Sequence, residues 1–412
     1  MRMLRRSVAL ATVGALLAGC GGGPGGGGGK ISDGAVVLAV LNDQSGIYAD
    51  LSGRGTIEVV RMAVADYQAK YGDKAVAEKI DVIAADHQNK PDVANSKAQE
   101  LYDRQRADVI VDVPTSSAAL AVATVAKNKK KVFLDVGAAT TELEGKGCNK
   151  YTFHYGYNSY MLANGTATAV TRDGAKNWYV VYPDYAFGQD MERTFTAAMK
   201  NSGGTVVESD PTPFPNDNFS TFLLKAPDLK PKPQVVGTMQ AGGDLVNFVK
   251  QYNEYKLRDQ GIELAIGLMF LTDIHSLGVD ALRGTRFTDY WYWNANPENR
   301  AWADRFQGKV GRRPTAAHAA NYSAALQYLE AVQRGGTDNA DAVVGQLEGR
   351  KVNDMFGRGG TIRAQDHLLI HDAYLAQVKS SGEVKEPWDY EKIIKTIPAA
   401  EAFQQPSAAC RL

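Results

Sequence analysis

A glycine-punctuated loop near the start of the chain has the setting of a ligand-binding site. The loop, DQSGIYADLSGRG, runs from Asp43 to Gly55 between the apolar run VVLAVLN and the helix-like segment TIEVVRMAVADY. A strand, a loop and a helix in this order commonly cradle phosphate, which binds the free amides of a helix N-terminus. A dinucleotide fingerprint requires G-x-G-x-x-G, but here Gly53 and Gly55 are followed by Glu58. Because a carboxylate there would repel pyrophosphate, and no P-loop motif occurs, we expect no nucleotide at this loop.

Motifs for hydrolysis and metal binding are also missing from the sequence. Neither G-x-S-x-G nor H-E-x-x-H occurs, and the histidines are scattered. His367 and His371 would share one face of a helix, but the run around them alternates like a strand, which separates them by roughly 13 Å. We therefore expect no enzymatic activity, no metal site and no cofactor, although any two of the 46 acidic residues could meet in the folded chain.

The N-terminus has the features of an export signal. MRMLRR carries three arginines and precedes SVALATVGALLA, an apolar run too short to span a bilayer comfortably. The run ends in Leu17-Ala18-Gly19-Cys20, which resembles the lipobox of bacterial lipoproteins; an ordinary secretory signal with a chance cysteine is the alternative. We expect residues 1–19 to be the signal peptide, Cys20 to carry lipid, and residues 20–34 to form a glycine-rich tether.

Length, charge and cysteine content set limits on the exported chain. Removing residues 1–19 leaves 412 − 19 = 393 residues and takes away three arginines, so the formal charge becomes 43 − 46 = −3. Nothing in this balance attracts nucleic acid or an anionic membrane. A chain of this length predicts two domains, since it exceeds the size at which one core stops growing. Cys148 and Cys410 are an even pair in an exported protein, which favours a disulfide over the alternative of two free thiols.

Strand and helix patterns alternate along the chain in two blocks. In the first block, four buried strands are predicted at VVLAVLN, IDVIAAD, ADVIVDVPT and KVFLDVG, with helical patterns between them. After the aromatic segment YTFHYGYNSY (151–160) the rhythm restarts with NWYVVYPD, TVVESD, QVVGTMQ and LAIGLMFL. This alternation predicts two α/β lobes with parallel sheets. A long helical pattern at 298–334 and a strand pattern at 368–378 then suggest that the chain crosses between the lobes more than once.

Several of these segments resemble one family, the substrate-binding proteins of ABC importers of the leucine/isoleucine/valine-binding type. The similar segments run in the family's order through nearly the whole mature chain: LNDQSGIYADLSGRGTIEVVRMAVADY, VPTSSAALAVA, VGAATTELEGKGC, YPDYAFGQDM, QAGGDLVNFVKQY and FLTDIHSLG. The resemblance implies a type I periplasmic-binding-protein fold, with two Rossmann-like lobes joined by a three-strand hinge that closes on a ligand. Crossovers are implied near Tyr155, Phe287 and Asp366. Lobe 1 is then residues 35–155 plus 287–365, and lobe 2 is residues 156–286 plus 366–412.

The resemblance also implies which groups of lobe 1 hold the ligand carboxylate. Family members use a hydroxyl and backbone amides from two loops, and the corresponding residues here are Ser116, Ser117, Ala138 and Thr140. The residue types agree, because a helix that opens at Ser116 offers its hydroxyl and free amides to an anion. Plain helix caps are the alternative for Ser116 and Ser117, and a cap on a surface loop is the alternative for Thr140.

The remaining implied contacts involve the ligand side chain and its ammonium group. Tyr48 and Leu51 of the first loop correspond to side-chain contacts, with simple packing as the alternative for Tyr48. In lobe 2, Tyr185 and Phe187 supply aromatic rings, although Phe187 stands where a tyrosine is expected. Asp273 corresponds to the family's glutamate and is the expected ammonium partner, with a solvated helix cap as the alternative.

One departure from the family pattern bears on ligand size. Leucine-type proteins place aromatic residues after the strand that corresponds to QVVGTMQ, whereas the present chain has Ala241-Gly242-Gly243-Asp244 there. We expect the glycines, Gly242 among them, to enlarge the cleft for a ligand bulkier than leucine, and aromatic ligands are candidates. The aromatic residues of YWYWN at 290–294 are expected to pack in the core, with a role in the cleft as the alternative.

The implied function is transport outside the cytoplasm. The protein would capture an amino acid or a related small organic acid and deliver it to an ABC permease and its ATPase. It would be a lipid-anchored monomer in the periplasm or on the extracytoplasmic face of a bacterial membrane. The alternative is a ligand-sensing receptor domain of the same fold, which signals and transports nothing.

Overall fold

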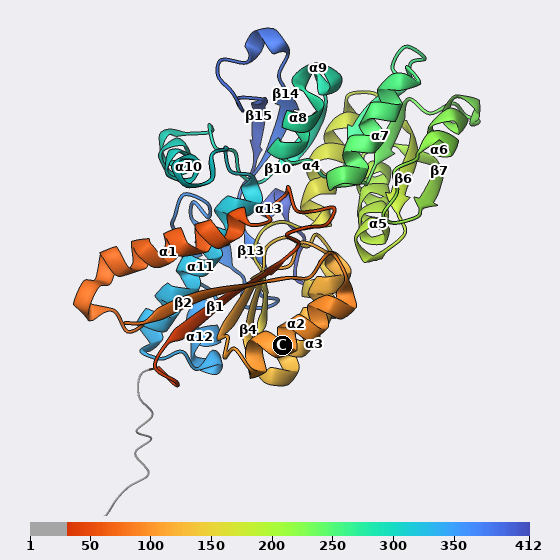
Figure 1. Ribbon diagram of the computed structural model, residues 1–412. Coiled ribbons are helices and arrows are strands. Elements are labelled where there is room, and N and C mark those ends of the chain that lie inside the picture. The colour runs from red at the N-terminus through yellow and green to blue at the C-terminus, as the bar shows by residue number, and fades with distance from the viewer. Residues whose placement is uncertain (1–30) are drawn as a thin grey trace, which may run out of the picture.

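Two α/β lobes make up the protein in the computed structural model, which describes residues 31–412 (Figure 1). The predicted signal peptide, Cys20 and most of the predicted tether lie outside the described residues. Residues 31–34, predicted as the end of the tether, already belong to the fold. Ile31 packs against the core, and the Ser32 amide donates to the Asp338 carboxylate. No helix among the described residues is both long and apolar enough to cross a membrane.

Lobe 1 is built on a parallel five-stranded sheet with the strand order β2-β1-β3-β4-β5. Its strands are β1 (Val36–Asn42), β2 (Ile80–Asp86), β3 (Val109–Asp112), β4 (Val132–Asp135) and β5 (Thr152–His154). One face is covered by α2 (Pro91–Asp103) and α3 (Ser116–Lys129), and the other by α1 (Gly55–Tyr71) and α11 (Ala316–Gly335) (Figure 1). All seven residues of β1 are buried, because alternate side chains enter the two opposite cores.

Lobe 2 repeats this plan with a parallel four-stranded sheet of order β7-β6-β8-β9. The strands are β6 (Asn177–Pro183), β7 (Thr205–Thr212), β8 (Val235–Thr238) and β9 (Glu263–Ile266). The helices are α4 (Ser159–Arg172), α5 (Ala186–Asn201), α6 (Ser220–Lys225), α7 (Gly242–Glu254), α8 (Leu271–Leu277) and α9 (Val279–Leu282). The prediction of two α/β lobes, each built on a parallel sheet, is confirmed.

A third, antiparallel sheet fixes where the chain crosses between the lobes. It has the order β10-β14-β15 and consists of β10 (Arg286–Asp289), β14 (Ala373–Val378) and β15 (Glu391–Ile397). Since β10 pairs with β14 on the lobe 2 side, the chain leaves lobe 2 after residue 289, close to the crossover implied near Phe287. The chain then forms α10 (Pro297–Val310), α11, α12 (Ala340–Leu347) and a small sheet of β11 (Lys351–Val352), β12 (Gly360–Ile362) and β13 (Leu369–Ile370).

The helical pattern predicted as one segment over 298–334 is two helices. Gly311, with a φ of 82°, adopts the left-handed conformation that ends α10. Pro314 follows in the connection, and Thr315 then caps α11. A glycine cap followed by a proline is a strong stop signal, so the break could have been predicted from the sequence.

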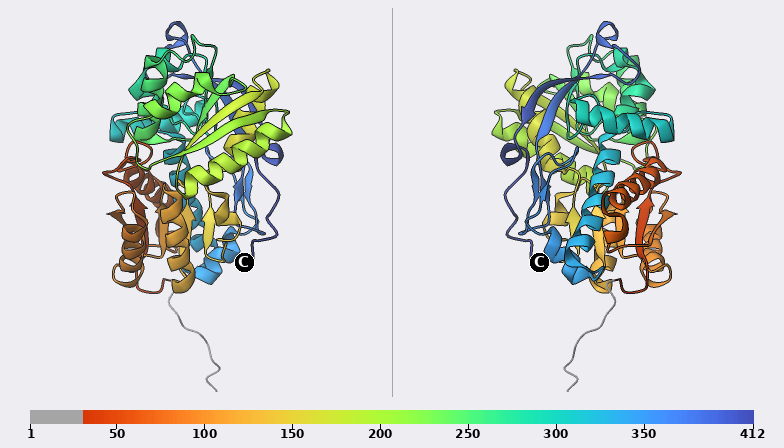
Figure 2. Two further views of the ribbon diagram at one scale, coloured as in Figure 1. Left: turned by 90° about the vertical axis from the view of Figure 1, so that its right-hand side faces the viewer. Right: turned by 90° about the vertical axis from the view of Figure 1, so that its left-hand side faces the viewer.

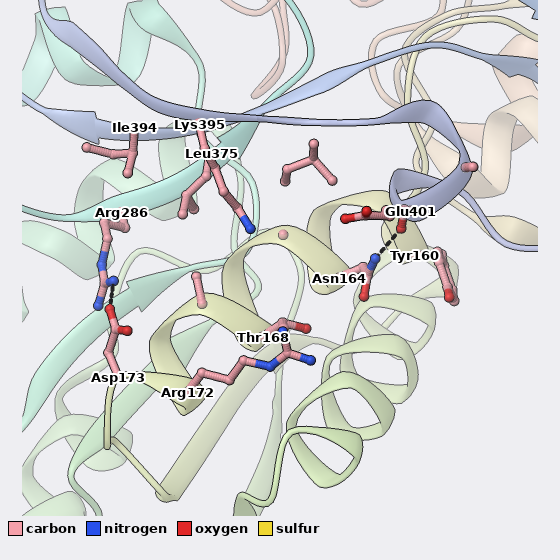
Figure 3. Close-up of a pocket in the computed structure, with 14 residues that line it drawn as sticks. Tyr160, Asn164, Thr168, Arg172, Asp173, Arg286, Leu375, Ile394, Lys395 and Glu401 are labelled. Carbon is pink, nitrogen blue, oxygen red and sulfur yellow. Dashed lines mark hydrogen bonds and ion pairs between the residues drawn. The ribbon is translucent and has the colours of Figure 1, made fainter.

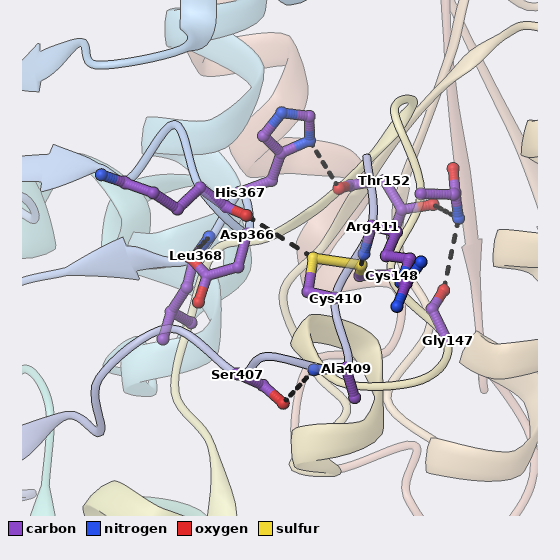
Figure 4. The surroundings of a disulfide bond; sticks show 12 residues. Gly147, Cys148, Thr152, Asp366, His367, Leu368, Ser407, Ala409, Cys410 and Arg411 are labelled. Atoms are coloured by element: carbon purple, nitrogen blue, oxygen red, sulfur yellow. Dashed lines mark hydrogen bonds between the residues drawn. A yellow bond between two sulfur atoms is a disulfide. The ribbon is translucent and has the colours of Figure 1, made fainter.

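The C-terminal tail returns to lobe 1, although β14 and β15 of the predicted lobe 2 segment 366–412 pair with β10 on the lobe 2 side. After α13 (Ala399–Ala402), Gln404 donates to the lobe 1 residue Glu144 at 2.9 Å. Cys410 forms the predicted disulfide with Cys148, and the Arg411 amide donates to the Cys148 sulfur (Figure 4). The C-terminus therefore lies beside lobe 1 (Figure 2).

This disulfide is expected to stabilise the fold substantially, because it closes a loop of 262 residues in the unfolded chain. In the chain-entropy account, replacing both Cys148 and Cys410 by serine should lower the free energy of unfolding by about 2 to 5 kcal/mol. Urea denaturation of the variant and of the reduced wild-type protein should give the same loss. Unchanged stability in both samples would show that the tail contributes nothing to the fold.

Candidate ligand-binding cleft

The candidate site lies where the carboxyl ends of the strands in the two lobes face each other. Such edges gather loops and helix N-termini in open parallel sheets. In lobe 1 the loops follow β1, β3 and β4, and in lobe 2 they follow β6, β8 and β9. The residues predicted to bind ligand come from these six loops and from the helix turns that follow them.

The loop after β1 is shaped by Asp43 and reaches across to lobe 2. The Asp43 carboxylate accepts from the amides of Gly46 at 2.6 Å and Tyr48 at 2.9 Å. A Cβ on Gly46 would lie 2.7 Å from this carboxylate, so a side chain there would displace the group that shapes the turn. At its far side the Tyr48 hydroxyl lies 2.5 Å from the Tyr185 hydroxyl of lobe 2. The two lobes are thus in contact across the cleft.

Gly242 has a different effect from the one predicted. Its φ is 57°, and a Cβ there would lie 2.6 Å from the Ile47 carbonyl oxygen and 2.9 Å from the Tyr48 ring. The Gly243 amide also donates to the Ile47 carbonyl at 3.4 Å. The glycines therefore let the lobe 1 loop approach closely, and the space they leave is filled by Ile47 and Tyr48. The inference that this stretch enlarges the cleft is wrong.

Aromatic rings surround the contact between the lobes. The Tyr185 ring stacks on Phe214 with centroids 4.1 Å apart, and Phe187 lies 5.8 Å from Tyr185. Tyr48 is 6.0 Å from the same Phe214. The predicted residues Tyr48, Tyr185 and Phe187 are therefore together in the structure. Phe214, from the loop after β7, was missed because nothing in its local sequence marks it.

A second aromatic group joins Tyr157 and Tyr290, from two segments that cross between the lobes, to Phe270 of the loop after β9. Tyr157 stacks on Tyr290 with centroids 4.7 Å apart, lies 6.2 Å from Phe270, and donates from its hydroxyl to the Gly137 carbonyl at 2.8 Å. The Tyr290 hydroxyl is buried and has no hydrogen-bond partner among the described residues. In YWYWN, Trp291 and Trp293 pack in the core as predicted, whereas Tyr290 joins this group. Tyr157 was not predicted, and for Tyr290 a role in the cleft was only the alternative to core packing.

The N-terminus of α3 presents several unpaired donors. Thr115 is the residue before the helix, and its hydroxyl bonds to Asn89, so it does not cap α3. The amides of Ser116, Ser117 and Ala118 have no partner within the described chain. The Ser116 hydroxyl is 99% buried and also unpartnered, while Ser117 is half-buried. Ser116 is therefore not a plain cap, and the arrangement suits an anion at the helix N-terminus.

The loop after β4 lies beside this helix N-terminus. A Cβ on Gly137 would lie 2.5 Å from Pro114 Cα, which shows how closely the two loops approach. Ala138 cannot serve a ligand through its amide, because that amide donates to Asp135 at 3.2 Å. The amides of Gly137, Ala139 and Thr140 in this loop have no partner within the described chain. Thr140 is buried and accepts from Glu142 N at 3.3 Å, so it does act as a cap, but not on the surface.

Asp273 and Leu51 were predicted to contact the ligand, but both make contacts that hold the fold together. Asp273 accepts from the Phe270 amide at 2.8 Å and caps α8 from a buried position. Burial raises the pKa of Asp273 to about 7, and burial likewise raises the pKa of Asp244 to about 7. Leu51 is buried, and its carbonyl accepts from the Thr315 hydroxyl at 2.7 Å, which ties this end of the loop to α11.

Two further buried carboxylates stand at the ends of β3 and β4. Asp112 accepts from Asn42 and Thr56, each at 3.0 Å, and Asp135 accepts from Ala138. One oxygen of each carboxylate has no partner among the described residues, and burial raises the pKa of both groups. Asp112 and Val113 also have φ values of 79° and 76°, a strained conformation for side-chain-bearing residues that costs about 1 to 3 kcal/mol each. Such strain is typical of functional loops.

A buried clasp joins the lobes beside the cleft. Asp190 of α5 accepts from the Thr141 amide at 2.8 Å and from the Thr141 hydroxyl at 3.0 Å. Thr141 begins a short 3₁₀ helix, η2 (Thr141–Glu144), in lobe 1, while Ser159 and Arg193 of lobe 2 bond the same carboxylate. Asp190 therefore holds the lobes together through charge-assisted hydrogen bonds.

Two other features of the described residues lie outside the cleft. A groove of about 600 Å³ runs between α4 and the β14–β15 strands (Figure 3). Its cations Arg172, Arg286 and Lys395 are opposed by Asp173 and Glu401, so the groove favours neither anionic nor cationic ligands.

A cluster of three acidic side chains lies elsewhere in lobe 1. Asp33, Asp108 and Asp338 bring carboxylate oxygens within 4.8 Å of one another, and Lys131 pairs with Asp108.

Comparison with known proteins supports this architecture. A family model described as a periplasmic binding protein matches residues 35–383. A periplasmic binding protein from Burkholderia mallei is 41% identical, covers 90% of this chain and 96% of its own, and superposes with a TM-score of 0.85. A branched-chain amino acid ABC transporter periplasmic ligand-binding protein from Burkholderia xenovorans is 33% identical, with coverages of 91% and 99% and a TM-score of 0.80.

A more distant relative has the same family character. Leu/Ile/Val-binding protein homolog 6 of Brucella melitensis is 26% identical over 279 residues, which are 67% of this chain and 70% of that protein. The predicted type I fold is confirmed by the solved structures. The chain belongs to the periplasmic binding protein family.

Proposed function

We propose that this protein is the extracytoplasmic substrate-binding component of an ABC importer, and that it closes its two lobes on a small organic acid or amino acid. The observation that carries the proposal is the N-terminus of α3, where the buried, unpartnered Ser116 hydroxyl and free amides stand beside the closed interface. An unsatisfied buried hydroxyl costs about 1 to 3 kcal/mol, which a bound carboxylate would recover. The permease and its ATPase are the proposed partners, and the lipid on Cys20 is the proposed anchor.

The aromatic lining favours an aromatic carboxylic acid as the ligand. Tyr157, Tyr290 and Phe270 offer flat apolar surfaces, and the buried hydroxyl of Tyr290 can pair with a polar substituent. Solute-binding proteins from Rhodopseudomonas palustris with this fold form complexes with 4-hydroxybenzoate and with benzoate. Those proteins are only 21% identical, so the lining residues of this chain carry the proposal.

The ligand class can be found with a thermal-shift screen of aromatic acids, aliphatic amino acids and amides. A ligand that binds only the native state raises its melting temperature. We expect benzoate-type acids to give the largest shifts. Uptake into vesicles that contain the permease would then separate transport from signalling.

The role of Asp273 offers a test of whether the ligand is an amino acid or an aromatic acid. An ammonium group needs the ionised carboxylate, so amino-acid binding should weaken as pH falls through about 7, where Asp273 takes up a proton. An aromatic acid has no such partner and should not weaken over this range. Asp273→Asn should therefore abolish amino-acid binding and leave aromatic-acid binding within a few-fold. Calorimetry of the variant with both ligand classes separates these outcomes.

Removing hydroxyls at the helix N-terminus and at the neighbouring loop should weaken ligand binding. Ser116→Ala removes a buried hydroxyl with no other partner and should raise the Kd about tenfold, whereas Thr140→Ala should have a smaller effect because Thr140 also caps η2. Ser96→Ala, on the exposed face of α2, is the matched control. Unchanged affinity in both cleft variants by calorimetry would place the ligand elsewhere.

The clasp at Asp190 should favour the closed form. Asp190→Ala removes its bonds to Thr141, so the unliganded protein should open more and the Kd should rise about tenfold. Small-angle X-ray scattering should show a larger radius of gyration than in wild type. Asp184→Ala, an exposed change on the same lobe, should alter neither quantity. Equal radii and affinities in all three proteins would mean that the clasp has no part in closure.

A further inference from the structure

His154 lies at the end of β5, beneath the loop that carries Ala138 and Thr140. It is 99% buried. Its Nδ1 lies 2.7 Å from a Glu144 carboxylate oxygen, and its Nε2 lies 2.7 Å from the Ala138 carbonyl oxygen. An oxygen of Asp135 stands 3.7 Å from the same Nε2.

These contacts require that both ring nitrogens carry a proton. Carboxylate and carbonyl oxygens only accept hydrogen bonds, so each nitrogen must donate, which makes the ring an imidazolium. The titratable groups packed against it are Glu144 from η2 and Asp135 from β4. Their attraction outweighs desolvation and raises the pKa of His154 to about 9. The charge on His154 therefore persists at neutral pH.

The Glu144 carboxylate that bonds His154 is itself held by residues away from the cleft. The second oxygen of Glu144 accepts from Asn158 at 2.5 Å and from Gln404 at 2.9 Å. Asn158 caps α4 at the first crossover, and Gln404 belongs to the tail that the disulfide holds against lobe 1. His154 thus connects a rigid frame to the loop.

The loop itself is held through its main chain. Ala138 is fixed at both its amide, by Asp135, and its carbonyl, by His154. The carbonyl of Gly137 accepts from Tyr157, and that of Ala139 accepts from the Ser159 amide at 2.7 Å. Among the amides of residues 137–140, only that of Ala138 has a partner within the described chain, so those of Ala139 and Thr140 are free.

We propose that His154 is a positioning residue of the ligand site, which as a buried cation fixes the Ala138 peptide and thereby aims the free amides of Ala139 and Thr140 at a ligand carboxylate. The inference rests on the proposed function for the identity of the site. The ordering of the loop by His154 does not depend on any ligand. The two parts can therefore be tested separately.

The ligand-independent part is tested by hydrogen exchange in the unliganded mature protein. His154→Gln should speed exchange in the segment 137–145 about tenfold, because the Ala138 carbonyl loses its charged donor. His367→Gln is the matched control: His367 is also buried and bonds Glu348 and the Thr152 carbonyl, but it does not touch the loop. If His154→Gln does not fold because Glu144 is left unpaired, the double variant His154→Gln/Glu144→Gln replaces it.

The ligand-dependent part uses benzoate, which does not titrate above neutral pH. Wild-type affinity should fall as pH rises through about 9, where the imidazolium loses its proton. The His154 variant should bind about tenfold more weakly at pH 7 and lack this pH dependence, whereas His367→Gln should match wild type.

Two results would overturn the proposal. One is unchanged loop exchange together with unchanged benzoate affinity in the His154 variant, and the other is a neutral His154 ring at pH 7 in the nitrogen-15 spectrum of the wild-type protein. If benzoate does not bind wild type, the aromatic-acid proposal fails, and the exchange result and ring spectrum alone decide the role of His154.

Discussion

Parallel strand pairing is the constraint on which the rest of this structure depends. Parallel neighbours can be joined only by crossovers, so helices cover both faces of each sheet and the central strands are apolar on both sides. The loops and helix N-termini that carry polar chemistry are consequently gathered at one edge. In this chain two such edges face each other, and the unpaired hydroxyl of Ser116 lies at that junction.

The interface between the lobes buries several carboxyl groups, and they differ in whether a cation lies nearby. The interface contains buried carboxylates at Asp112, Asp135, Asp244 and Asp273, and burial raises the pKa of each. Only Asp135 has a cation nearby, in His154, while Asp112 relies on neutral donors. A carboxylate ligand is favoured where free amides and an unpaired hydroxyl gather, as they do at the N-terminus of α3.

The sequence predicts the lobes well because their signals are local. The apolar runs that form β1 to β4, the helix patterns between them and the pairing of Cys148 with Cys410 follow from composition and periodicity. The path of the tail does not, since β-strand and helix patterns carry no information on which lobe receives the last residues.

The site was predicted less completely, because contacts between lobes cannot be read from one segment. Tyr48 and Tyr185 were both chosen, but their hydroxyl contact depends on how the lobes close. Gly242 was predicted to enlarge the cleft, whereas the close approach of Ile47 fills the space beside it. Ala138 was assigned to the ligand although its peptide is held by Asp135 and His154, two residues with no sequence motif of their own.

The central claim is that an organic acid binds between the lobes with its carboxylate at α3. The most direct measurement is the crystal structure of the protein with the ligand that a thermal-shift screen identifies. The account predicts the carboxylate within about 3 Å of the Ser116 hydroxyl and the Thr140 amide, with its apolar body against Tyr157 and Tyr290. A ligand bound outside the cleft, or one whose carboxylate faces lobe 2, would contradict it.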